Sequence, residues 1–151
     1  MIRLHETVEV PRPVEEAFAY TSDFANIEQW DPGVSASARL ADGPVGPGSR
    51  FRLDVAFGPF TTPMEYVVTR FEPPRRVVLE GEGARIRAVD DIRFEPAPGG
   101  TRIDYTADLA CPLLGLFGAE DRSPTPEQVA QHEQVLKQHG KHYEFTMYPD
   151  A

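Results

Sequence analysis

Residues 2–20 read IRLHETVEVPRPVEEAFAY, and within them the period of the apolar side chains changes. Over residues 2–10 apolar and polar side chains alternate, as in a half-buried strand. Pro11 and Pro13 end this strand, and apolar residues at helical spacing follow to about Tyr20. The stretch predicts a strand that leads directly into a short helix.

A second short helix and six further strands are predicted beyond it. Asp23 is placed to cap a helix that ends before Pro32. Period-two stretches separated by Pro- and Gly-rich turns then predict strands at residues 34–41, 51–57, 61–72, 77–79, 86–94 and 103–109. Within 61–72 the apolar phase changes, which predicts a β-bulge or a strong bend. This order predicts an α+β domain with a curved antiparallel sheet whose concave face is covered by helices.

Several stretches, in this order, resemble the START-like superfamily, also called polyketide cyclase/dehydrase or SRPBCC proteins. They are residues 8–20 with the following Ser-Asp-Phe, residues 30–34 (WDPGV), residues 48–51 (GSRF) and residues 99–103 (GGTRI). The resemblance covers residues 1–109. It implies a helix-grip fold, in which a seven-stranded sheet grips a long C-terminal helix over a hydrophobic cavity. It does not imply one function, because members carry lipids, bind plant hormones, cyclise polyketides or assist chaperones.

After Leu109 the sequence departs from that pattern. Residues 113–117 form a continuous apolar run, a capping box at Thr125 opens a helix that ends at Gly140, and residues 143–147 alternate. We therefore expect an atypical strand-helix-strand segment in place of the gripping helix. The expected division is a START-like ligand-binding domain at residues 1–109 and a segment at residues 110–151 that is not an independent domain.

The tail resembles the C-terminal part of dienelactone hydrolases, which are α/β-hydrolases. The matching residues are 111–121, 124–127 and 148–151. The resemblance implies that Asp121 stands where that family has its triad acid. The sequence contains neither a nucleophile elbow nor the histidine that this acid would orient, so we do not expect hydrolase activity. Either the tail helix, with Val129, Val135 and Leu136, replaces the gripping helix, or the tail is loosely attached.

The charge and composition of the chain limit the kinds of partner that we expect it to bind. The net charge of −9 over 151 residues disfavours nucleic acid and anionic membranes. No apolar run approaches the roughly 20 residues of a membrane span. The single cysteine, Cys111, excludes an internal disulfide and agrees with a reducing cytoplasm. We expect a cytoplasmic protein that binds a small hydrophobic molecule without a cofactor, and a homodimer is an alternative way to cover a groove that the tail leaves open.

Large side chains of the second helix and the sheet are the candidate ligand-binding residues. On a concave sheet they either leave irregular space for a flat ligand or pack solidly against one another, and the sequence leaves both alternatives open. The candidates are Phe24, Trp30, Phe51, Leu53, Val55, Met64, Tyr66, Ile103 and Tyr105.

Two carboxyl groups, Glu6 and Asp90, fall in the inward phase of predicted strands. Burying a carboxylate is costly unless it is paired or neutralised. They either anchor a ligand, or reach solvent or pair with Arg85 or Arg87. A buried carboxyl whose pKa is raised can act as a general acid or base, so the candidate catalytic residues of a cyclase or dehydratase are Glu6, Asp90 and Tyr66.

The histidines of the tail do not predict a metal site. Zinc needs three or four convergent ligands, whereas His132, His139 and His142 have no placed cysteine or carboxylate partner. We expect a solvated helix face there and no metal. The sequence thus favours a module that binds a small hydrophobic or aromatic molecule, lipid-like or polyketide-like, without covalent chemistry. A cyclase or dehydratase and a non-catalytic fusion product are the alternatives.

Overall fold

In the computed structural model the protein is described over residues 2–57, 60–110, 113–118, 126–138 and 143–148. The chain divides into two compact units, Met1–Ala110 and Cys111–Ala151. The first holds a seven-stranded sheet with two short helices, and the second holds a two-stranded sheet with one helix. The division falls where the periodicity of the sequence changes.

The first unit begins with strand β1 (Ile2–Val10), helix α1 (Val14–Ser22) and the 3₁₀ helix η1 (Phe24–Gln29). Six strands follow: β2 (Val34–Arg39), β3 (Arg50–Phe57), β4 (Phe60–Glu72), β5 (Arg76–Gly83), β6 (Arg87–Ala97) and β7 (Gly100–Ala110). All seven pair antiparallel in the order β1-β7-β6-β5-β4-β3-β2. The predicted seven-stranded antiparallel sheet, with two short helices after its first strand, is confirmed.

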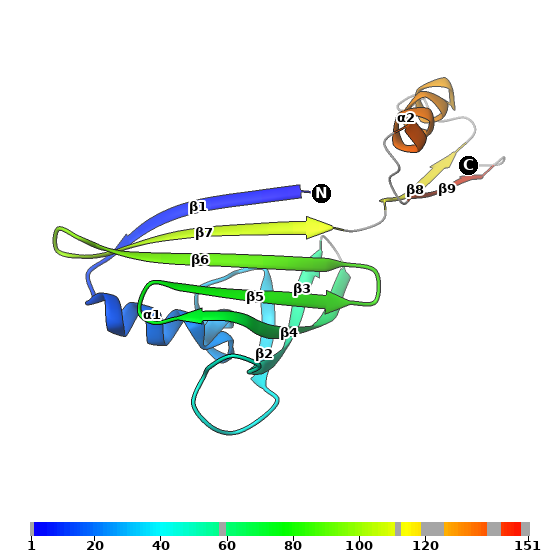
Figure 1. The fold of residues 1–151 in the computed structure, drawn as a ribbon. Coiled ribbons are helices and arrows are strands. Elements are labelled where there is room, and N and C mark those ends of the chain that lie inside the picture. The colour runs from blue at the N-terminus through cyan, green and yellow to red at the C-terminus, as the bar shows by residue number, and fades with distance from the viewer. Residues whose placement is uncertain (1, 58–59, 111–112, 119–125, 139–142, 149–151) are drawn as a thin grey trace. The chain divides into compact units, whose positions relative to one another are not determined.

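The sheet is strongly curved. Figure 1 shows β2 and β3 running across the direction of β6 and β7, with α1 on one side of the sheet. The predicted irregularity in β4 is a β-bulge, because the register with β5 shifts between Val68 and Arg70. The bulge turns Phe71 toward the core and leaves Arg70 exposed.

The two short helices supply the cover of the concave face. Helix α1 buries Ala17, Phe18, Thr21 and Ser22, which lie at helical spacing on one side. The predicted cap of the second helix is confirmed, because the Asp23 side chain accepts a hydrogen bond from the N–H at position 25 at 3.2 Å.

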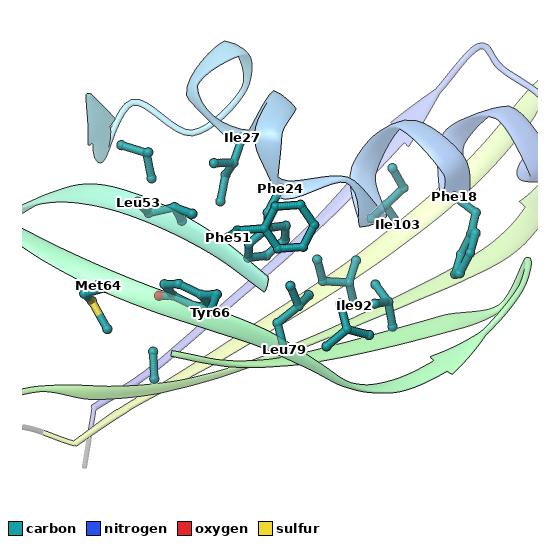
Figure 2. Close-up of a cluster of buried hydrophobic side chains, with 14 of the residues drawn as sticks. Phe18, Phe24, Ile27, Phe51, Leu53, Met64, Tyr66, Leu79, Ile92 and Ile103 are labelled. Atoms are coloured by element: carbon teal, nitrogen blue, oxygen red, sulfur yellow. The ribbon is translucent and has the colours of Figure 1, made fainter. Parts of the chain in front are cut away.

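The core lies between η1 and strands β3 to β6. Figure 2 shows Phe24 against Phe51 and Tyr66, at ring-centroid distances of 6.1 and 5.6 Å. Aliphatic side chains fill the space around these rings, among them Leu53 and Leu79. This cluster holds η1 in its position on the concave face, because well-packed interiors tolerate little change in volume.

The second unit consists of β8 (Leu113–Gly118), α2 (Pro126–Gln138) and β9 (Tyr143–Tyr148). Strands β8 and β9 pair parallel from Leu113 opposite Tyr143 to Gly118 opposite Tyr148. The predicted strand-helix-strand segment is confirmed, since parallel neighbours need a crossover connection. Within α2 Val129 is buried.

Some predictions for the tail lie outside the described residues. They concern Cys111, Asp121, the cap at Thr125, His139, the helix end at Gly140, and His142. His132 lies in α2. Among the helices that the structure describes, none has the length and apolar character needed to cross a membrane.

Candidate functional site

A cavity of about 1190 Å³ lies within the first unit, between β1, α1 and the end of the sheet formed by β6 and β7. Strand β1 contributes Arg3 and His5 and, from its even-numbered phase, Leu4, Glu6, Val8 and Val10. The register sets these opposite residues of β7 on the same face of the sheet, because paired residues of antiparallel strands share a face. The first and last strands of the unit therefore build one wall together.

Helix α1 and the segment after η1 form the opposite side. Ala17, Tyr20 and Thr21 come from the inner side of α1, and Trp30 and Asp31 follow η1. The α1 residues lie three or four positions apart, which brings them to one face of the helix. The carboxylate of Asp31 accepts a hydrogen bond from the Gly33 N–H at 2.7 Å, which holds this segment in a turn.

Aromatic rings connect the cavity to the core. The ring of Trp30 stands perpendicular to that of Tyr105 at a centroid distance of 6.1 Å, and it meets Phe24 edge-on at 6.3 Å. Such edge-to-face pairs are favoured by the ring quadrupoles. The Trp30 Nε1–H is buried and has no hydrogen-bond partner among the described residues. Trp30 is the only tryptophan of the chain, so its fluorescence reports on this wall.

The carboxyl group of Asp90 is buried on β6, the strand that pairs with β7 of the cavity wall. Asp90 is 3% exposed, and the Tyr105 hydroxyl donates a hydrogen bond of 2.6 Å to its Oδ1. Asp90 itself is opposite Ala107, so Tyr105 reaches it diagonally across β6 and β7. Tyr105 thus belongs to the cavity wall and to the buried group at once.

Burial shifts the protonation of this cluster. It raises the pKa of Asp90 to about 6, because loss of water disfavours the charged form; the hydrogen bond from Tyr105 opposes this, and the charge of Asp31 adds to it. Burial and the neighbouring Asp90 also raise the pKa of Tyr105 and of Tyr66, so that both phenols stay protonated. The cluster combines a titrating carboxyl with two neutral hydroxyl groups.

The position of Tyr66 depends on a glycine. Tyr66 is opposite Gly81 on β5, and a Cβ atom added to Gly81 would lie 2.4 Å from the Tyr66 Cζ. The ring therefore lies directly over the glycine backbone. From there the neighbouring charges of Asp90 and Asp31 add to burial in raising the pKa of Tyr66.

The predicted ligand-binding residues divide between the cavity wall and the core. Trp30, Ile103 and Tyr105 line the cavity. The other six do not line this cavity and belong to the packed core or lie against it, so their part in ligand binding stays a prediction: Phe24, Phe51, Leu53, Val55, Met64 and Tyr66. The reason is the position of η1, which packs on this part of the concave face and fills the space above β3 and β4.

The two predicted carboxyl groups also differ. Asp90 is buried, as its inward phase indicated, and its hydrogen-bond partner is a tyrosine, while Arg87 pairs with Glu82. Glu6 is exposed at the edge of the cavity, as in the alternative that it reaches solvent.

Several lining residues were not among the candidates. Leu4, Val8 and Val10 alternate in the sequence, but nothing there indicates that they stay uncovered. Ala17 and Thr21 lie on the apolar face of α1, and that periodicity would have identified them.

Within the part of the chain that the structure describes, no group of three or more His, Cys, Asp or Glu side chains is arranged to hold a metal ion.

Sequence comparison connects this architecture to a known family. The family model described as "Polyketide cyclase / dehydrase and lipid transport" matches residues 1–131. The chain belongs to this family. The resemblance to polyketide cyclase/dehydrase proteins is thereby confirmed, and the match extends beyond Leu109 into the tail. No curated protein matches the chain.

Solved structures of other proteins share this fold. A START superfamily protein from Mycobacterium smegmatis is 19% identical, with a TM-score of 0.60 over 91% of either chain. A protein from Thermus thermophilus is 16% identical, with a TM-score of 0.60 over 91% of this chain and 88% of that one. A protein from Deinococcus radiodurans is 20% identical, with a TM-score of 0.57 over 93% and 97%. At these identities the likeness concerns the fold alone. The similarity of the tail to dienelactone hydrolases is not shown and stays a prediction.

Proposed function

We propose that the cavity binds a small, largely apolar or aromatic molecule of the lipid or polyketide kind. The observation that carries the proposal is the cavity of about 1190 Å³, with apolar walls from β1, α1 and β7. Ligand pockets are mostly apolar and contain a few placed polar groups that orient the ligand. Here Glu6, Asp31 and Tyr105 are among the polar residues of the lining, and the Tyr105 hydroxyl donates a hydrogen bond of 2.6 Å to Asp90.

The Tyr105 hydroxyl favours a ligand that carries a hydroxyl group of its own. A phenol can donate one hydrogen bond and accept others. Because the Tyr105 proton is directed to Asp90, the oxygen remains able to accept from a ligand. A flat ring beside Trp30 gains edge-to-face contact in the same place. We therefore expect an aromatic alcohol to bind more tightly than the same ring without its hydroxyl.

Dye binding tests the proposal through Trp30. The probe is 1-anilinonaphthalene-8-sulfonate, which accepts energy from an excited indole; we expect its fluorescence to rise and that of Trp30 to fall together. Val8→Glu places a negative charge in the apolar wall, which also repels the sulfonate of the dye, and should weaken binding about ten-fold, as for the loss of one apolar side chain. Val89→Glu is the matched control, because Val89 is similarly exposed but lies outside the cavity lining. Equal dye binding by the two variants would refute the site.

A second candidate function is a cyclase or dehydratase. It is favoured by the buried Asp90, whose pKa lies near neutrality and whose partner Tyr105 reaches the cavity. As a base, Asp90 accepts the Tyr105 proton while the Tyr105 oxygen accepts a proton from the ligand. Asp90→Asn and Tyr105→Phe should then abolish turnover of aromatic polyketide analogues but leave dye binding intact. Loss of folding in both variants would indicate a structural role instead.

We also propose that residues 1–109 are the ligand-binding domain and that residues 110–151 are not an independent domain. Two parallel strands and one helix are fewer elements than a parallel sheet normally needs, and the compact units divide at Ala110. Limited proteolysis of the full chain tests the attachment. Rapid cleavage between Ala110 and Pro126 supports a loosely attached tail, and protection supports a tail that replaces the gripping helix.

A further inference from the structure

Strand β1 is an edge strand of the seven-stranded sheet. It pairs with β7 on one side, and within residues 2–110 no element pairs with its other side (Figure 1). Every residue from Ile2 to Glu9 is exposed, and the apolar Ile2, Leu4 and Val8 are 54%, 53% and 52% exposed. A long edge strand with an exposed apolar face is a template for pairing with another strand.

We propose that this edge pairs with β1 of a second copy of the chain, antiparallel and centred on Glu6. A two-fold axis through Glu6 sets each residue opposite the one equally far from Glu6 on its other side. On the cavity face Leu4 then meets Val8 of the second copy, and Ile2 meets Val10. On the other face Arg3 meets Glu9. Nine residues of each strand take part, so the whole strand is used.

Charge complementarity is the main argument for a second copy as the partner. Within one molecule Arg3 binds Asp108 at 2.7 and 2.8 Å, and Arg102 lies 3.6 Å from Glu9. Pairing of two β1 strands joins these pairs into a row across four strands, in which Asp108, Arg3, Glu9 and Arg102 alternate in sign. The symmetry repeats the row at the other end of the interface. Opposite charges directly across a strand pair are stabilising.

Neighbouring registers lack this match. If the cavity faces of both sheets are to lie on the same side, the two-fold axis must pass through a residue of β1. Only then do side chains of the same phase lie opposite each other. A centre at His5 sets Glu6 against Leu4, and a centre at Thr7 sets Glu6 against Val8. Neither brings Arg3 opposite Glu9. The register centred on Glu6 alone pairs apolar with apolar and acid with base.

This register also sets the two Glu6 side chains against each other on the axis. Like charges directly opposite are destabilising. We therefore expect a dimer of limited affinity and a Glu6→Gln variant whose dissociation constant is about two- to five-fold lower. The proposal goes beyond the proposed function and does not depend on it, because the oligomeric state is measured without any ligand.

Charge exchange tests the interface in the full chain. Sedimentation velocity of the unmodified protein should show a concentration-dependent dimer. Arg3→Glu and Glu9→Arg should each raise the dissociation constant roughly ten-fold or more, because each variant sets like charges opposite in its own dimer. A mixture of the two variants should dimerise again, since unlike charges are then opposite at both ends. A monomer at every concentration, or a mixture that does not recover, would overturn the proposal.

Cross-linking tests the register if a charge variant fails to fold. In a Cys111→Ser background, Glu6→Cys should form a disulfide-linked dimer on mild oxidation, since directly opposite residues lie within disulfide reach. Leu4→Cys alone should not, but Leu4→Cys mixed with Val8→Cys should. Efficient cross-linking of Leu4→Cys to itself, or none of Glu6→Cys, contradicts the register.

Discussion

The substitution Asp90→Asn should stabilise the protein at neutral pH. Folding raises the pKa of the Asp90 carboxyl from 3.8 to about 6, and burial is the largest cause. A carboxyl whose pKa is higher in the folded state favours folding when protonated. Its contribution is therefore fully present below pH 3.8 and is lost as the pH rises through 6. A shift of roughly two units corresponds to about 3 kcal/mol at pH 7 and above.

Asparagine has nearly the same shape, remains neutral, and still accepts the hydrogen bond of Tyr105. The free energy of unfolding of Asp90→Asn should therefore exceed that of the unmodified protein by up to about 3 kcal/mol near pH 8. The difference should shrink to roughly 1 kcal/mol near pH 4.5 and vanish at lower pH. Other carboxyl groups titrate equally in both proteins, so the difference isolates Asp90.

Urea unfolding followed by Trp30 fluorescence measures this difference, since Trp30 contacts the ring of Tyr105. Measurements at several values between about pH 4 and pH 8 cover the window in which Asp90 titrates. If Asp90→Asn is less stable than the unmodified protein at neutral pH, or if the gap does not depend on pH, the burial argument is wrong. A gain in stability accompanied by loss of turnover would fit a site that sacrifices stability for function.

Further substitutions test the surroundings of Asp90 and, separately, the cap of η1. Gly81→Ala sets a methyl group against the ring of Tyr66, 2.4 Å from its Cζ before relaxation. It should lower the free energy of unfolding by about 1–3 kcal/mol in urea titrations. Unchanged stability would show that the ring moves freely. Tyr105→Phe removes a hydrogen bond to Asp90 and should raise the pKa of Asp90 further. In urea titrations it should lower the free energy of unfolding by about 1–3 kcal/mol at pH 8 and by less at pH 4. A loss that does not depend on pH would contradict the hydrogen bond to Asp90. Asp23→Ala removes the cap of η1 and should lower stability by about 1 kcal/mol in thermal unfolding, whereas Asp23→Asn should retain most of the cap; an equal loss in both would assign the effect to the charge instead.

Much of the fold could be predicted because its signals are local. Alternating side chains and the turn residues between them identify the strands, and the carboxylate of Asp23 marks the start of η1. Even the bulge in β4 was predictable, since Phe71 falls out of phase with Val68. Each of these features depends on residues close in sequence.

The position of the cavity could not be predicted from the sequence, because it depends on tertiary packing. The sequence does not show that η1 covers β3 and β4, and this position decides that Phe51 and Met64 belong to the core while Leu4 and Val8 belong to the cavity. The partner of Asp90 required the register of the β6–β7 hairpin, which brings Tyr105 to a diagonal position.

The pairing of β1 with β7 governs the order in which the cavity forms. Ile2 is opposite Leu109, so this wall joins residues from the two ends of the first unit. Contacts so distant in sequence carry a large loop-closure entropy and slow the folding of sheet proteins. During synthesis the hairpins from β2 to β6 can form first. Strand β1 cannot pair along its full length until Leu109 has left the ribosome. We therefore expect the cavity to be the last part of this unit to form during synthesis, and its apolar strand to be open to aggregation before then.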